Sequence, residues 1–192
     1  MGSIKSICVF CGSGFGGNKE ILDAAIRLSR AMISRDMNLV FGGGNDGLMK
    51  VIADEFMKYN KTVIGIIPQE YVDMNREYPN MTELITTKNM ADRTGVMIDF
   101  ADGFIILPGG YGTLNELFTV LFSLRMGRIT KPCAVLNTAS YFDYLLKFLD
   151  ECVKNGLLGK SPRSVLFSND NPDTILEYFV NYEPIVITSK WV

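Results

Sequence analysis

Histidine is absent from this 192-residue sequence, and its absence excludes several kinds of active site. No Ser-His or Cys-His nucleophile pair can form, and no histidine is available to ligate a metal ion. Acid–base chemistry at neutral pH would therefore depend on carboxylates, lysine, tyrosine, arginine-assisted water or the substrate itself.

Cysteine is scarce, with only Cys8, Cys11, Cys133 and Cys152 in the chain. The first two have the spacing of a redox pair, but the stretch ICVFC has the pattern of a β-strand, which turns the two side chains to opposite faces. A thioredoxin-type pair begins a helix instead, and four scattered cysteines make a poor zinc site. We interpret the thiols as core residues and predict no metal site.

An excess of charge and a long apolar run are also missing. Lysine and arginine number 19 and aspartate and glutamate 21, so electrostatics offers no reason to expect a nucleic acid or a membrane surface as partner. No apolar run approaches the roughly 20 residues of a membrane helix, and the N-terminus lacks a signal-peptide pattern. The prediction is a cytoplasmic protein that binds neither nucleic acid nor membrane.

Short apolar runs rich in β-branched residues alternate with segments of helical period, and 47% of the residues are hydrophobic. The runs that predict strands lie at 6–11, 38–42, 62–67, 83–87, 103–108, 132–137 and 164–168. Helical period is clear at 18–35 and at 140–155. This α/β order predicts a Rossmann-like, doubly wound parallel sheet in three layers, with residues 1–192 as a single domain. Residues 68–82 are expected to form a long irregular loop, and the strand-like tail 182–192 to pack on the sheet edge or a partner.

Three of the predicted strands are followed by glycine-rich turns at 11–17, 42–47 and 108–113. Each turn would begin a helix and offer backbone N–H groups to an anion. Because ligands of doubly wound sheets bind at the carboxyl ends of the strands, the three turns together favour a phosphorylated ligand.

The first turn contains Gly12-x-Gly14-x-x-Gly17, the glycine pattern of dinucleotide sites. That pattern also requires an acidic residue about 20 positions further on, at the end of the second strand. Glycines occupy that position here, so a mononucleotide is favoured over a dinucleotide. A nicotinamide-dependent oxidoreductase remains an alternative that titration with NAD would test.

The stretch LPGGYGTLNE places Thr113 and Glu116 in the spacing of a capping box. Glu116 is then expected at the third position of a helix whose first turn faces the ligand. The same carboxylate could stabilise positive charge developing on a sugar ring. We predict that Glu116 is both a helix cap and a catalytic residue.

The segments CGSG, VFGGGNDGLM and PGGYGTLNE closely resemble those of the LOG ("lonely guy") family, the cytokinin riboside 5′-monophosphate phosphoribohydrolases. The similarity extends from about residue 6 to residue 160. It implies hydrolysis of the N-glycosidic bond of a nucleoside 5′-monophosphate, such as AMP or an N6-substituted AMP, to a free base and ribose 5-phosphate without a cofactor. It also implies a homodimer or larger homo-oligomer, with residues 89–100 and 113–126 as contact helices.

The resemblance assigns roles residue by residue. Glu116 and Arg93 are the catalytic candidates, with Arg93 at the family's spacing from the carboxylate. The candidates for binding the substrate and its phosphate are Gly109, Gly110, Tyr111, Gly112, Thr113, Gly12, Ser13, Gly43, Gly44, Asn45 and Met90. Asp46 either reaches the site or caps the helix that follows it.

The chain departs from the family pattern at three positions. Ala91 and Thr94 replace a histidine and a lysine beside the functional arginine, and Asn75 stands at the ungapped position of a loop glutamate. These changes keep open a second interpretation, a nucleotide or cofactor carrier on the same fold. Relatives also bear the name lysine decarboxylase, but pyridoxal phosphate chemistry needs a Schiff-base lysine, and the glycine-rich turns have only Lys50 nearby, one turn into a helix.

Overall fold

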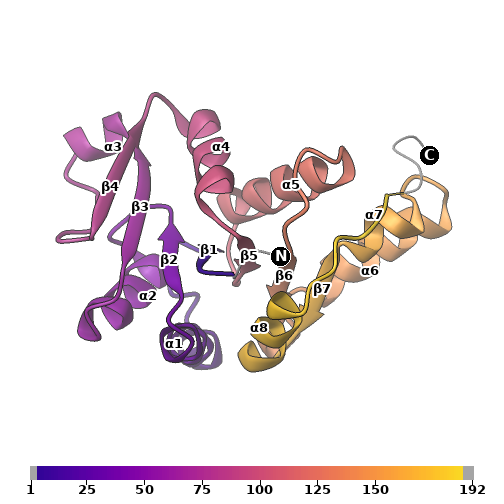
Figure 1. Cartoon of the computed structure of the whole chain (residues 1–192), viewed down its shortest axis with the longest axis horizontal. Helices are drawn as coiled ribbons and strands as arrows, with labels where there is room; N and C mark the ends of the chain where they lie inside the picture. Colours follow the sequence, from indigo (N-terminus) through magenta and orange to yellow (C-terminus); the bar gives the residue numbers. More distant parts are fainter. Residues whose placement is uncertain (1–3, 188–192) are drawn as a thin grey trace.

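The protein is built around one parallel β-sheet. A computed structural model describes residues 4–187. The strand order of the sheet is β4-β3-β2-β1-β5-β6-β7 (Figure 1). The strands are β1 (Ser6–Phe10), β2 (Asn38–Phe41), β3 (Val63–Pro68), β4 (Glu83–Thr87), β5 (Gly103–Ile106), β6 (Cys133–Leu136) and β7 (Leu166–Asn169). Each of the seven runs expected to form a strand overlaps one, so the predicted doubly wound sheet is confirmed.

Helices cover both faces of the sheet. They are α1 (Lys19–Ser34), α2 (Gly47–Lys58), α3 (Gln69–Asp73), α4 (Met90–Phe100), α5 (Tyr111–Arg125), α6 (Asp143–Lys154), α7 (Lys160–Ser164) and α8 (Pro172–Val180), with a 3₁₀ turn at Thr138–Ser140. In Figure 1, α1, α2 and α8 lie on one side of the sheet and α4 and α5 on the other. Most of these helices bury a single apolar stripe, as amphipathic helices on a sheet do.

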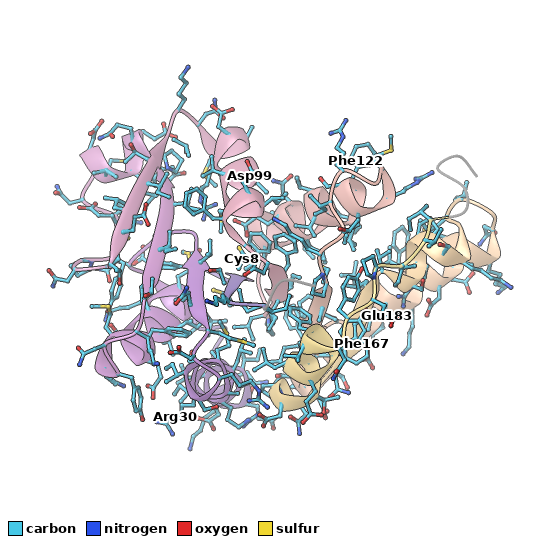
Figure 2. All side chains as sticks on the ribbon, in the orientation of Figure 1. Cys8, Arg30, Asp99, Phe122, Phe167 and Glu183 are labelled. Atoms are coloured by element: carbon cyan, nitrogen blue, oxygen red, sulfur yellow. The ribbon has the colours of Figure 1, made fainter. Side chains whose placement is uncertain are left out.

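The central strand β1 is buried on both faces because its side chains alternate between two cores. Ile7 and Val9 belong to the core beneath α1, α2 and α8, whereas Cys8 and Phe10 belong to the core beneath α4 and α5. Cys8 lies in the middle of the sheet in Figure 2. Cys11 lies in the first core, so the expectation that the two thiols occupy opposite faces is confirmed.

The sheet reverses its winding at β1, which pairs in parallel with β2 on one side and β5 on the other. Ligands of open α/β sheets bind at such a switch point, outside the carboxyl ends of the strands. The glycine-rich turns follow β1, β2 and β5, so this topology brings all three to the same edge.

The stretch 68–82 is less irregular than the sequence suggests. Residues Gln69–Asp73 form the short helix α3, and Glu77 makes an isolated antiparallel bridge with Gly44. The Tyr78 N–H also donates to the Gly43 carbonyl at 2.7 Å. The expectation of a loop without secondary structure is wrong here, because the segment pairs its backbone with the second glycine-rich turn.

The tail forms no strand within its described part, residues 182–187. Ile185 and Ile187 instead pack against the core beneath α4 and α5, and the Ser161 hydroxyl of α7 donates to the Val186 carbonyl. The strand-like interpretation is wrong for these residues, because Pro184 lacks the N–H that a strand ladder uses. Residues 188–192 lie outside the described part of the chain. Between residues 4 and 187, no helix has the length and apolar character to cross a membrane.

Candidate active site

A cavity of about 360 Å³ opens at the carboxyl ends of β1, β2 and β5. Ten of the predicted site residues line it: Gly12, Ser13, Gly44, Met90, Arg93, Gly110, Tyr111, Gly112, Thr113 and Glu116. Its size lies within the range of small-ligand pockets. The structure therefore brings together residues from three glycine-rich turns and two helices that are far apart in the sequence.

Glu116 and Arg93 form a buried ion pair at this cavity. The Arg93 Nη1 donates to Glu116 Oε1 at 2.8 Å, and its Nε donates to the Ile66 carbonyl at 2.9 Å. Glu116 is 7% exposed, and so is Arg93. The two hydrogen bonds hold the guanidinium between the end of β3 and α5, so that it orients the carboxylate.

The capping-box prediction for Glu116 is wrong. Helix α5 begins at Tyr111 with Gly110 as its N-cap residue, which places Glu116 sixth in the helix and Thr113 within its first turn. The two glycines before Tyr111 let the helix begin earlier than the Thr-x-x-Glu pattern indicates. The carboxylate therefore faces Arg93 and the cavity, and its role is not that of a cap.

Burial controls the protonation of Glu116. Removal from water raises its pKa to about 7, although the charge of Arg93 and its hydrogen bond act in the opposite direction. Desolvation disfavours the ionised carboxylate, and here it outweighs the ion pair. A carboxyl group that exchanges its proton near neutral pH is suited to acid–base or electrostatic catalysis.

Two glycines are required by close packing at this site. A Cβ atom at Gly42 would lie 1.7 Å from Arg93 Nη2, so only glycine lets the guanidinium pass the end of β2. Gly47 has a φ of 56°, and a Cβ there would lie 2.3 Å from the backbone carbonyl carbon of Ser13. The first and second glycine-rich turns are therefore in direct contact at the rim of the cavity.

The first turn of α5 is the candidate phosphate site. Leu114 donates back to the Gly110 carbonyl at 3.0 Å, and this is the first bond along the helix. The N–H groups of Tyr111, Gly112 and Thr113 thus have no partner within the helix and lie at its positive end. They line the cavity from the side of β5.

Three predicted binding residues do not line the cavity. Gly109 lies behind it, where a Cβ would be 2.1 Å from Thr113 Oγ1 and 2.8 Å from Gly12 N. The Gly43 carbonyl accepts a bond from the 68–82 segment, and the Asn45 N–H donates to the Arg76 carbonyl at 3.1 Å. These residues shape the site through their backbones, which contact neighbouring turns.

The sequence interpretation missed side chains that the 68–82 segment and α2 contribute. These are Tyr71, Arg76 and Met49, which line the cavity. Asp46 was predicted either to reach the site or to cap the next helix, and it lines the cavity as well. Asp46 is the N-cap residue of α2 but makes no side-chain cap bond, and its Oδ2 lies 3.6 Å from Arg76 Nη2. The length of the 68–82 segment was the signal, since it follows directly on the carboxyl end of β3.

The glycine pattern of the first turn does not act as a dinucleotide fingerprint. The third glycine of that fingerprint allows close packing of helix against strand. A Cβ at Gly17 would meet nothing within 4 Å, so no such packing occurs here. Across residues 4–187, no three cysteine, aspartate or glutamate side chains come together in a way that could hold a metal ion.

Comparison with known proteins identifies clear relatives. A family model described as "Possible lysine decarboxylase" matches residues 49–179. The chain is 36% identical over 191 residues to cytokinin riboside 5′-monophosphate phosphoribohydrolase LOG5 of Arabidopsis thaliana. This alignment covers 97% of this chain and 84% of LOG5. The chain is 37% identical over 180 residues to LOG2 of the same plant, with coverages of 94% and 84%.

Solved structures share the fold at lower identity. The molybdenum cofactor binding protein from Rippkaea orientalis matches with a TM-score of 0.68 and 21% identity, covering 91% of this chain and 94% of that protein. The Moco carrier protein from Chlamydomonas reinhardtii matches with a TM-score of 0.66 and 16% identity, with the same coverages. At these identities the similarity establishes a common architecture.

Proposed function

Because the chain belongs to the LOG family of cytokinin riboside 5′-monophosphate phosphoribohydrolases, we propose that it hydrolyses the N-glycosidic bond of a purine nucleoside 5′-monophosphate. AMP and N6-substituted AMP are the proposed substrates, and a free base and ribose 5-phosphate the products. The observation that carries the proposal is the buried Arg93–Glu116 pair, at 2.8 Å, in a cavity lined by free helix N–H groups.

The chemistry follows from the position of the carboxylate. Breaking the bond between C1′ and the base nitrogen leaves the bonding electrons on the base and positive charge on the ribose ring. An ionised Glu116 stabilises that charge and orients the water that attacks C1′. Arg93 holds the carboxylate in place, and its hydrogen bond to the Ile66 carbonyl limits its own movement.

Residues around the Arg93–Glu116 pair are suited to bind the 5′-phosphate and the base of the substrate. The N–H groups at the start of α5 would bind the 5′-phosphate, assisted by the Thr113 hydroxyl. Met49, Tyr71 and Met90 also line the cavity and provide apolar and aromatic surface for a base. Arg76 at the rim adds a positive charge near the mouth of the cavity.

The "lysine decarboxylase" description does not suit this cavity. None of the described residues that line it is a lysine, so no Schiff base to pyridoxal phosphate can form there. Lys50 is paired with Asp54 at 2.6 Å. The charged groups that line the cavity are the carboxylates Glu116 and Asp46 and the arginines Arg93 and Arg76. These groups suit hydrolysis.

Incubation of the protein with AMP and with N6-isopentenyl-AMP tests the proposal. We expect free base and ribose 5-phosphate to appear in equal amounts by chromatography, and the ratio of kcat/KM for the two nucleotides to reveal the preferred base. Binding of both nucleotides without release of base would contradict the proposal. It would favour a carrier on the same fold, the second candidate, which rests on the departures from the family pattern at Ala91 and Thr94. The solved molybdenum cofactor carriers share that fold.

A homodimer through α4 and α5 is also part of the proposal. Met90, Phe100, Phe118 and Phe122 on these helices are exposed, and Phe122 lies on the outer side of α5 (Figure 2). Clustered exposed aromatic residues are typical of subunit contacts. We expect a dimer in analytical ultracentrifugation and a monomer after Phe122→Glu, because burying the new charge would oppose association. A wild-type monomer would contradict this part.

A further inference from the structure

A strained turn follows β6 at the same edge of the sheet as the cavity. Ala139 and Ser140 have φ angles of 53° and 57°, in the left-handed region that residues with a side chain rarely adopt. Two such residues in succession cost free energy and persist only where surrounding contacts impose them. The sequence predicts a helix that begins at residue 140, but α6 begins at Asp143 because of this turn.

Asn137 imposes this conformation. Its side-chain oxygen accepts from the Phe142 N–H at 2.7 Å, and its side-chain nitrogen donates to Asp143 Oδ1 at 2.8 Å. Its own N–H donates to the Asn169 carbonyl of β7 at 2.8 Å. These bonds hold the turn against both β7 and the start of α6. They thereby fix the position of Tyr141, which lies in the turn between Asn137 and Phe142.

The Tyr141 hydroxyl donates to the Gly109 carbonyl at 2.8 Å, across 32 residues of sequence. The carbonyl of one residue and the N–H of the next point in opposite directions across a planar trans peptide. The bond to Gly109 therefore fixes the direction of the Gly110 N–H, and Gly110 itself lines the cavity. Glycine on both sides of this peptide leaves it little intrinsic preference for one orientation.

We propose that Tyr141 is a positioning residue of the phosphate site, which orients the Gly109–Gly110 peptide so that its N–H is presented to the substrate's phosphate. The inference rests on the proposed function, because it assumes that the first turn of α5 binds that phosphate. Tyr141 does not line the cavity, so it acts through the peptide and not by contact with the substrate.

Calorimetric titration of the full chain with AMP, ribose 5-phosphate and adenosine tests the inference without requiring turnover. In Tyr141→Phe, we expect the dissociation constants of AMP and ribose 5-phosphate to rise about three- to tenfold, as for the loss of one well-oriented hydrogen bond. The affinity for adenosine, which has no phosphate, should stay unchanged. Tyr144→Phe is the matched control, since Tyr144 is 85% exposed and does not line the cavity.

Each result supports or overturns the inference. Equal weakening of AMP and adenosine would assign Tyr141 a general structural role and overturn it, as would equal ribose 5-phosphate affinity in the variant and the wild type. If the variant is unstable, an NMR titration of the wild type with inorganic phosphate provides a second test. The backbone amide resonance of Gly110 must then shift, and an unchanged resonance would overturn the inference. Nucleotide binding without hydrolysis would contradict the proposed function. The same titrations would still test the role of Tyr141, because they measure binding and not turnover.

Discussion

Glu116→Gln is expected to lower kcat for AMP hydrolysis by about 10²- to 10⁴-fold, the usual contribution of a positioned acid–base or charge-stabilising group. Glutamine has nearly the same shape and still accepts the bond from Arg93, which is 2.8 Å in the wild type. It lacks the negative charge that stabilises the developing positive charge on the ribose. Steady-state kinetics with quantified base release measures the effect, and the dissociation constant for AMP should change little.

Glu55→Gln is the matched control for this substitution. Glu55 is also buried and paired with an arginine, since Arg30 Nε lies 2.8 Å from its Oε1. It belongs to α2 and does not line the cavity, and its partner Arg30 lies on α1 (Figure 2). Loss of this charge should leave kcat unchanged. If Glu116→Gln retained more than about a tenth of wild-type kcat, a decrease far below that expected of a catalytic group, Glu116 would not be the catalytic carboxylate.

Arg93→Met is expected to have the second large effect, through the protonation of Glu116. In the wild type, kcat/KM should rise with pH around a midpoint near 7, because Glu116 acts in its ionised form and burial raises its pKa to about 7. Arg93 opposes that increase by its charge and its hydrogen bond. Its removal should therefore move the midpoint to higher pH by about one unit or more.

The same substitution should lower activity at pH 7 by about fivefold or more, because the ionised fraction of Glu116 falls from about a half to about a tenth or less when its pKa rises by one unit or more. A pH–rate profile measured with AMP and with adenosine separates this effect from titration of the substrate's phosphate, which adenosine lacks. Arg30→Met, which removes the cation beside Glu55, should leave the profile in place. A wild-type rate that falls as pH rises through 7 would assign Glu116 the role of a proton donor and contradict the prediction.

Local patterns predicted the architecture. The seven apolar runs became seven strands, because strands buried on both faces need continuous hydrophobic sequence and little else. The glycine-rich turns after β1, β2 and β5 were equally visible, since turn chemistry depends on neighbouring residues. Family resemblance selected Glu116 and Arg93, and the structure places both at one cavity.

Other features depend on contacts that no local pattern records. The start of α5 was predicted three residues late, because Gly110 and not Thr113 is its N-cap residue. The predicted role of Glu116 as a cap was wrong for the same reason. Arg76 reaches the cavity only because its segment pairs with the second glycine-rich turn, and the strained turn that precedes Tyr141 is held by Asn137.

The sequence by itself determined a doubly wound sheet with three glycine-rich turns at one edge. The tertiary structure alone decided which side chains meet there and in what state of charge. Arg93 and Glu116 are 23 residues apart on different helices, and their bond requires the guanidinium to pass Gly42 at the end of β2. The pKa of Glu116 depends on how much water the assembled elements exclude, which is a property of the packed molecule and not of any segment.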